Sequence, residues 1–198
     1  MAELKDLALR VARALNQTEI RYVIVGGFAV IARGMPRTTM DVDLIVEDDA
    51  EKIALLFAEL KGLNFDIMAR QTQNALLEGT NISVFDELSP LRIDLKIARK
   101  DEDRMALDYA SWEDFEGEQI RVASPELILF GKVLYLGDIS DIPDSEFLEY
   151  GDIKDFLAVF QNAASINLTW LREKVAEAGL TETLNRLVAA AENFDDTE

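Results

Sequence analysis

The spacing of apolar and polar residues predicts that strands and helices alternate along the N-terminal part of the chain. Apolar residues recur at helical spacing from Leu4 to Leu15, which indicates an amphipathic first helix that ends near Asn16. Short apolar runs bounded by glycine, proline or acidic residues indicate buried strands. The expected strands are residues 21–25, 41–46, 81–85, 91–98 and 118–123.

Capping residues mark several helix ends. Asp48-Asp49 should cap a helix that runs to about Lys61, and Ser124-Pro125-Glu126 combines an N-cap hydroxyl, a first-turn proline and an acid near the helix dipole. The other expected helices are 28–33, which Gly34 and Pro36 should stop, and 101–110, 145–163, 167–178 and 181–194. We therefore expect an α+β protein: a mixed β-sheet flanked by helices in residues 1–123, with a helical subdomain in residues 124–198 packed on that core.

The composition restricts the available chemistry, because the chain contains neither cysteine nor histidine. A zinc site of the usual kind, a thiol nucleophile and an imidazole base are therefore excluded. Catalysis would depend on carboxylates, lysine, arginine, hydroxyl groups and hard ions bound by oxygen, such as Mg²⁺. No apolar run approaches the roughly 20 residues that span a bilayer, and the charged N-terminal helix is unlike a signal peptide. We expect a cytoplasmic protein without a membrane partner.

The net charge argues against a general affinity for nucleic acid. The chain has 38 acidic and 20 basic residues, a net charge of −18. Such a protein is a poor binder of phosphate backbones, and DNA is not an expected partner. Five basic residues close together in sequence form either a local basic face or, more simply, a solvated charged surface. They are Arg92, Lys96, Arg99, Lys100 and Arg104.

Acidic residues within two apolar strands are the first candidates for chemistry. Asp41 and Asp43 are two residues apart in one expected strand, so their side chains share a face about 7 Å apart. Asp94 stands alone among apolar neighbours in another strand, opposite the face of its neighbours Ile93 and Leu95. Carboxylates that converge repel each other unless a cation neutralises them. Three acids from two strands predict a site for one or two Mg²⁺ ions that bridge to nucleotide phosphates.

A glycine turn supplies the expected phosphate site. Gly26-Gly27 ends the first strand, and glycine permits a close approach of the backbone to an anion. Arg37 and Thr39 come just before Asp41, and Thr39 belongs to the same odd-numbered set as the two acids. Arginine offers a bidentate contact to phosphate. We therefore expect a triphosphate between the glycine turn and the metal-binding carboxylates.

The motif "GG…RTTMDVD", followed by a lone strand aspartate, resembles the nucleotidyltransferase fold of the DNA polymerase beta-like superfamily. Residues 20–47 are most similar to the AbiEii/MenT-type nucleotidyltransferase-like toxins and their relatives. The resemblance continues in the second half, where those families carry a helical lysine and then a Lys-Asp-x-x-Asp signature. Lys132 fits the lysine, and Asp152 and Asp155 have the Asp-x-x-Asp spacing, but Gly151 stands where a basic residue is expected.

The resemblance implies an enzyme that transfers a nucleotide from an NTP to a hydroxyl group, with Mg²⁺ or Mn²⁺ as the cofactor. Asp41, Asp43 and Asp94 would bind the metal, and Asp94 would accept the proton of the attacking hydroxyl. Lys132 would stabilise charge on the triphosphate, and Asp152 or Asp155 would orient Lys132 or the base and sugar. The acceptor would be tRNA or a protein, and an antitoxin would be a partner.

Simpler interpretations stay open at each position. The aspartate pair could lie on a solvated strand, Asp94 on an edge strand, and Lys132 on the polar side of an amphipathic helix. The remaining candidates could be a structural turn at Gly26-Gly27, a surface ion pair at Arg37 and a solvated helix face at Asp152 and Asp155. The whole chain could correspondingly be a nucleotide-binding or regulatory module without turnover, or an interaction protein with a basic partner.

Overall fold

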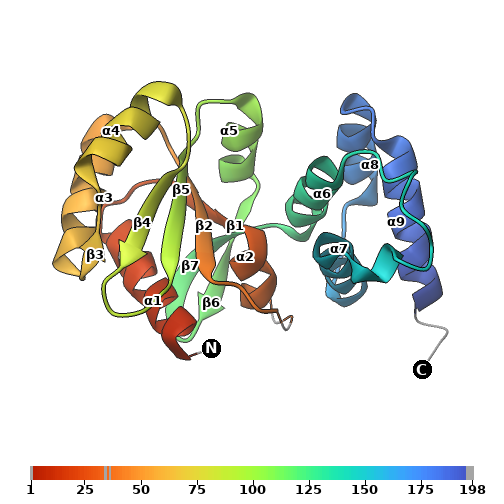
Figure 1. Ribbon diagram of the computed structural model, residues 1–198, viewed down its shortest axis with the longest axis horizontal. Helices are drawn as coiled ribbons and strands as arrows, with labels where there is room; N and C mark the ends of the chain where they lie inside the picture. The colour runs from red at the N-terminus through yellow and green to blue at the C-terminus, as the bar shows by residue number, and fades with distance from the viewer. Residues whose placement is uncertain (1, 34, 36, 195–198) are drawn as a thin grey trace. The chain divides into compact units, whose positions relative to one another are not determined.

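The computed structural model describes residues 2–33, 35 and 37–194. The chain forms two compact units, residues 1–123 and the residues from 124 onward, and each is described by itself (Figure 1). Gly34 and Pro36, which were expected to stop the first short helix, lie outside the described residues. No helix in the described part of the chain has both the length and the apolar character that crossing a bilayer requires.

The first unit is built on a seven-stranded sheet with the order β3-β4-β5-β2-β1-β7-β6. Its strands are β1 (Tyr22–Val25), β2 (Asp41–Val46), β3 (Phe65–Asp66), β4 (Ile82–Asp86), β5 (Arg92–Ile97), β6 (Ala110–Phe115) and β7 (Glu118–Ala123). β2 runs parallel to β5 and β1 runs parallel to β7, whereas the other neighbours pair antiparallel. The expectation of a mixed sheet is confirmed.

Apolar alternation fixes the register of the two central strands. Val42 and Leu44 of β2 are buried, as are Ile93 and Leu95 of β5, while the residues between them are partly exposed. Burial of each such side chain contributes roughly 1.5–3 kcal/mol, and a slip of one residue would turn the apolar set toward solvent. The polar residues of both strands are therefore held together on the opposite face.

Helices flank this sheet (Figure 1). They are α1 (Ala2–Gln17), α2 (Gly26–Ala32), α3 (Ala50–Gly62), α4 (Ala69–Glu78) and α5 (Asp101–Asp108). α1 packs against α3 and β7, and α2 packs against β1, β2 and β7. The expected cap of α3 is present, because the Asp49 carboxylate accepts hydrogen bonds from the backbone N–H groups of Glu51 and Lys52.

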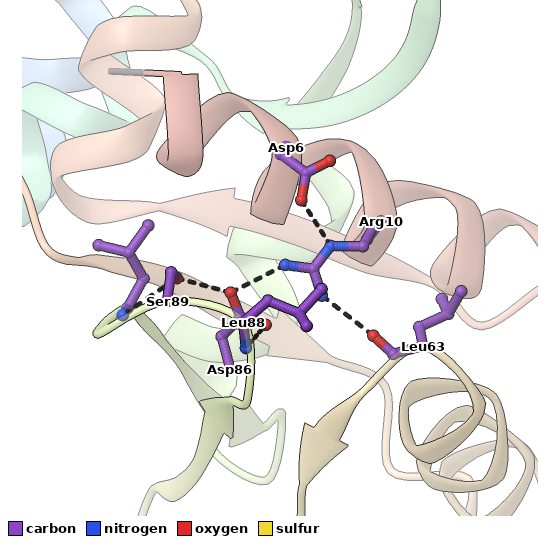
Figure 2. A network of polar contacts seen from close by, with 7 residues as sticks. Asp6, Arg10, Leu63, Asp86, Leu88 and Ser89 are labelled. Carbon is purple, nitrogen blue, oxygen red and sulfur yellow. Dashed lines mark hydrogen bonds and ion pairs between the residues drawn. The ribbon is translucent and has the colours of Figure 1, made fainter.

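A buried ion pair joins α1 to the end of β4 (Figure 2). The guanidinium of Arg10 donates to Asp86 at the end of β4 and to the backbone carbonyl of Leu63, both within 3.0 Å. The Asp86 side chain is fully buried and also accepts a hydrogen bond from Ser89. Burial alone would raise the pKa of Asp86, but the hydrogen bonds from Arg10 and Ser89 outweigh it and hold the pKa below its usual value.

The second unit is helical, as expected. It contains α6 (Pro125–Leu136), a short 3₁₀ helix (Phe147–Glu149), α7 (Gly151–Asn162), α8 (Leu168–Glu177) and α9 (Thr181–Phe194). α6 packs against α7 and α8, and both of these pack against α9. The hydroxyl of Ser124 caps α6 by accepting from the backbone N–H of Leu127.

Several elements differ from the expected ones. β3, α4 and β6 were not predicted, since β3 has two residues and β6 is a partly exposed edge strand without apolar alternation. The single helix expected over 145–163 is two elements that meet at Tyr150, whose backbone is extended. The short helix α2 begins at Gly26 itself and not after the glycine pair.

Candidate active site on the polar face of β2 and β5

The first glycine of the turn lies against an acidic side chain of the candidate site. Val25 ends β1 opposite Asp43 in the antiparallel β1–β2 register, and Gly26 follows with a positive φ of 64°. A Cβ atom at Gly26 would lie 2.0 Å from Oδ2 of Asp43. Any side chain at this position would therefore clash with the carboxylate unless one of them moved. Glycine is therefore required here both by its backbone conformation and by the closeness of the carboxylate.

The second glycine is enclosed by the residues that precede β2. A Cβ atom at Gly27 would lie 2.9 Å from Nε of Arg37 and 3.0 Å from Oγ1 of Thr39. The sequence predicted that Arg37 and Thr39 would accompany the acids, and the structure places both at the glycine turn. The glycine turn thus meets Asp43 through its first residue and meets Arg37 and Thr39 through its second.

The parallel β2–β5 register brings the three predicted acids to one face of the sheet. Asp43 is the Cα partner of Asp94, and Asp41 is the partner of Arg92. The three aspartates are partly exposed on the face opposite the buried Val42. β5 lies between β4 and β2, so the interpretation of Asp94 as an edge-strand residue is wrong.

Arg92 lies between two of these acids. Its Nε donates to Oδ2 of Asp94 at 2.9 Å, and its Nη2 donates to Oδ2 of Asp41 at 3.1 Å. The hydrogen bond to Asp94 and the charge of that carboxylate raise the pKa of Arg92 further above its usual value. Arg92 therefore stays cationic and partly neutralises the acidic face.

Hydroxyl groups hold the other carboxylate oxygens of the same two acids. Thr39 Oγ1 donates to Oδ1 of Asp41 at 2.7 Å, and Ser83 Oγ donates to Oδ1 of Asp94 at 2.6 Å. Ser83 is on β4, directly opposite Asp94 in the antiparallel register. Each of these carboxylates is consequently fixed by a hydroxyl on one oxygen and by Arg92 on the other.

The ligand atoms available at this site are of the type that a hard divalent cation prefers. Asp41, Asp43 and Asp94 offer only carboxylate oxygens, the ligands that Mg²⁺ and Mn²⁺ prefer, from adjacent strands on one face. Within the described residues, however, no three acidic side chains are gathered closely enough to form a metal-ligating group. The guanidinium of Arg92 bridges two of these carboxylates instead.

The second unit contains a separate buried charge cluster. Nζ of Lys132 on α6 donates to Oδ1 of Asp152 at 2.6 Å and to Oδ2 of Asp155 at 2.5 Å, both on α7. Lys132 and Asp155 are each only 8% exposed, so the alternatives of a polar helix side for Lys132 and a solvated face for Asp155 are wrong. Two acids around one lysine leave a net charge of about −1 within this trio.

The sequence did not identify Arg92 or Ser83 as site residues. Arg92 was grouped with four other basic residues, of which Lys96, Arg99 and Arg104 form ion pairs with acids outside the site. The strand period could have identified Arg92, because residues two apart in a strand share a face and Asp94 follows Arg92 by two. Ser83 carried no signal without the β4–β5 register.

Comparisons with known proteins agree with this architecture. Neither a scan against protein-family models nor a search of curated proteins found a match. Among solved structures, the solution structure of the antibiotic-resistance factor ANT(2'')-Ia aligns at 20% identity, covering 100% of this chain and 99% of that one, with a TM-score of 0.59. Its crystal structure with adenylyl-2''-tobramycin aligns at 19% identity over 96% and 98% of the two chains, with a TM-score of 0.55.

A third similar structure is an antigenic nucleotidyltransferase-like protein from Paracoccidioides brasiliensis. It aligns at 22% identity over 97% of this chain and 93% of that one, with a TM-score of 0.58. At this level of identity the likeness establishes the architecture. The chain therefore has the nucleotidyltransferase fold.

Proposed function

We propose that this protein is a nucleotidyltransferase that moves a nucleotide from an NTP to a hydroxyl acceptor and depends on Mg²⁺ or Mn²⁺. The observation that carries this proposal is the juxtaposition of three elements on one face. Asp43 of β2 is the register partner of Asp94 of β5, and Asp41 lies on the same face of the sheet. The turn at Gly26 lies against the Asp43 carboxylate.

In this proposal Asp41, Asp43 and Asp94 hold the metal, which when bound supplies positive charge to the triphosphate. The Gly26-Gly27 turn and Arg37 hold the phosphates. The acceptor oxygen bonds to the α-phosphorus, its proton passes to a carboxylate oxygen of Asp94, and pyrophosphate leaves with the electrons of the broken P–O bond.

We assign Lys132 to charge stabilisation, and Asp152 and Asp155 to the orientation of Lys132. The contacts within the second unit support the latter role, because both carboxylates accept hydrogen bonds from Nζ. A buried lysine between two acids is held in one position by these two hydrogen bonds.

The acceptor is the finer part of the proposal. A tRNA suits a chain of net charge −18 poorly, whereas a protein hydroxyl or a cationic small molecule avoids that repulsion. The crystallised ANT(2'')-Ia complex contains adenylyl-2''-tobramycin, a small molecule that carries an adenylyl group. A toxin role with an antitoxin partner predicts growth arrest on expression, and Asp43→Asn should relieve that arrest.

The test is label transfer from each of four α-labelled NTPs, with Mg²⁺ or Mn²⁺, to tobramycin, to bulk tRNA and to cell proteins. Wild type should transfer label to at least one acceptor class, and Asp43→Asn should reduce transfer by at least about 100-fold. Asp108→Asn is the matched control, because it removes the same charge from an exposed pair with Arg21. Equal transfer by wild type and Asp43→Asn would contradict the proposal.

A second candidate is a nucleotide-binding module without turnover. The bridging of Asp41 and Asp94 by Arg92, together with Gly151 in place of a basic residue, favours it. It predicts that NTP and metal raise the melting temperature while no acceptor or water yields pyrophosphate. Release of pyrophosphate that Asp43→Asn abolishes would exclude it.

A further inference from the structure

The arrangement around Arg92 has the form of an internal counter-ion. The guanidinium contacts one oxygen of Asp41 and one of Asp94, and it also experiences the charge of Asp43. Three carboxylates and one guanidinium leave a formal charge of −2 within this group of four side chains. A divalent cation in place of the guanidinium would offset more of the negative charge, and it would compete with Arg92 for the same two oxygens.

The exposures of these groups differ in a way that permits exchange. The Arg92 side chain is 44% exposed, whereas that of Asp94 is 15% exposed. Arg92 can swing toward solvent on a flexible stem, while the carboxylates are retained by Thr39 and Ser83 on their opposite oxygens. Departure of the guanidinium would therefore leave the acids in place and free their Oδ2 atoms.

We propose that Arg92 neutralises the Asp41–Asp94 pair when no divalent cation is bound, and that cation binding displaces its guanidinium from both carboxylates. This inference rests on the proposed function, because it takes the three acids as the metal ligands. Competition with Arg92 would then keep the metal affinity of this protein below the intrinsic affinity of the three carboxylates. The apparent metal affinity then equals the intrinsic affinity multiplied by the fraction of molecules in which Arg92 is not paired with the acids.

The first test measures binding of Mn²⁺ alone by electron paramagnetic resonance, in the full chain and without nucleotide. Arg92→Met keeps an unbranched side chain about as long as the aliphatic stem of arginine and removes the competing guanidinium, so its Kd should fall about tenfold relative to wild type. Arg104→Met is the matched control, because Arg104 pairs only with the exposed Asp101 among its described ion pairs. Adding Asp43→Asn to Arg92→Met should abolish the tight binding, which locates the ion at these acids.

Thermal unfolding gives a second readout that does not depend on metal affinity alone. Without divalent ions, Arg92→Met should melt below wild type because three carboxylates lose their counter-charge, and Mn²⁺ should restore more of its stability than it adds to wild type. Arg92→Lys keeps the charge but replaces the planar guanidinium fork with a compact ammonium on a shorter reach, so its Kd should lie between those of wild type and Arg92→Met.

An unchanged or higher Kd in Arg92→Met would overturn the inference, and so would the absence of Mn²⁺ binding in both proteins. Neither result decides the proposed function, which the transfer of labelled nucleotide tests independently.

Discussion

Gly26 lies so close to Asp43 that a single added carbon would meet the carboxylate at 2.0 Å. The contact joins the residue that follows β1 to the second acid of β2. Because Gly26 also has a positive φ, its identity is constrained twice.

Gly26→Ala is therefore expected to be more harmful than an ordinary glycine substitution. We expect a loss of about 2–4 kcal/mol in unfolding free energy, of which backbone strain supplies about 1 kcal/mol and the clash the remainder. Gly117→Ala is the control, since Gly117 has a φ of 86° and open space around it. Urea denaturation of both variants measures the difference, and equal losses would contradict the account of Gly26.

The hydroxyl groups of Thr39 and Ser83 are expected to position the acids. Thr39→Val and Ser83→Ala each remove a hydrogen bond to a carboxylate oxygen that Arg92 does not contact. Such supporting groups are typically worth about 10–100-fold in metal affinity or activity. We expect weaker Mn²⁺ binding in both variants and unchanged binding in Thr80→Val, an exposed threonine of the same unit. A structural role alone would lower stability without changing the Kd for Mn²⁺.

The ion pair of Arg10 and Asp86 should make stability depend on pH. Asp86→Asn removes one partner of a buried pair and is expected to cost about 3–5 kcal/mol at pH 7. Since the folded-state pKa of Asp86 is lowered, its contribution is complete above the unfolded-state value of about 3.9 and is lost as pH falls through the folded-state value.

The measurement is the difference in unfolding free energy between wild type and Asp86→Asn at pH 7, 5 and 3. The difference should persist from pH 7 to 5 and shrink at pH 3. Asp66→Asn, at an exposed position of β3, should show little difference at any pH. A difference for Asp86→Asn that stays constant down to pH 3 would show that its carboxylate charge is not the stabilising feature.

Lys132→Met should destabilise the second unit, because it leaves Asp152 and Asp155 without their shared cation. The expected loss in unfolding free energy is about 3–5 kcal/mol, because the Lys132–Asp155 pair is buried. Replacing Asp155 by Asn in the same chain should recover part of the loss, since one uncompensated charge is removed. Lys174→Met removes a lysine from a helix-surface pair with Glu177 and should cost less than about 1 kcal/mol. Similar costs for the two lysines would contradict a buried electrostatic role for Lys132.

Local patterns in the sequence predicted the parts of the site that depend on strand period. Alternation in β2 and β5 placed Asp41, Asp43 and Asp94 on polar faces, and the structure confirms those faces. Arg92 was missed because its role depends on pairing with Asp41 on another strand, and no local pattern encodes that pairing. β6 was missed for a related reason: an exposed edge strand gains its order from the hydrogen bonds of its neighbour and not from its own burial.

Binding of metal and triphosphate together tests the central claim most directly. Calorimetric titration of non-hydrolysable analogues of the four NTPs, with and without Mg²⁺, should give saturable binding of at least one analogue to wild type only when the ion is present. Asp43→Asn should abolish this binding, whereas Asp108→Asn should leave it unchanged. Binding of equal strength in wild type and Asp43→Asn, or no binding of any analogue with Mg²⁺, would contradict the account.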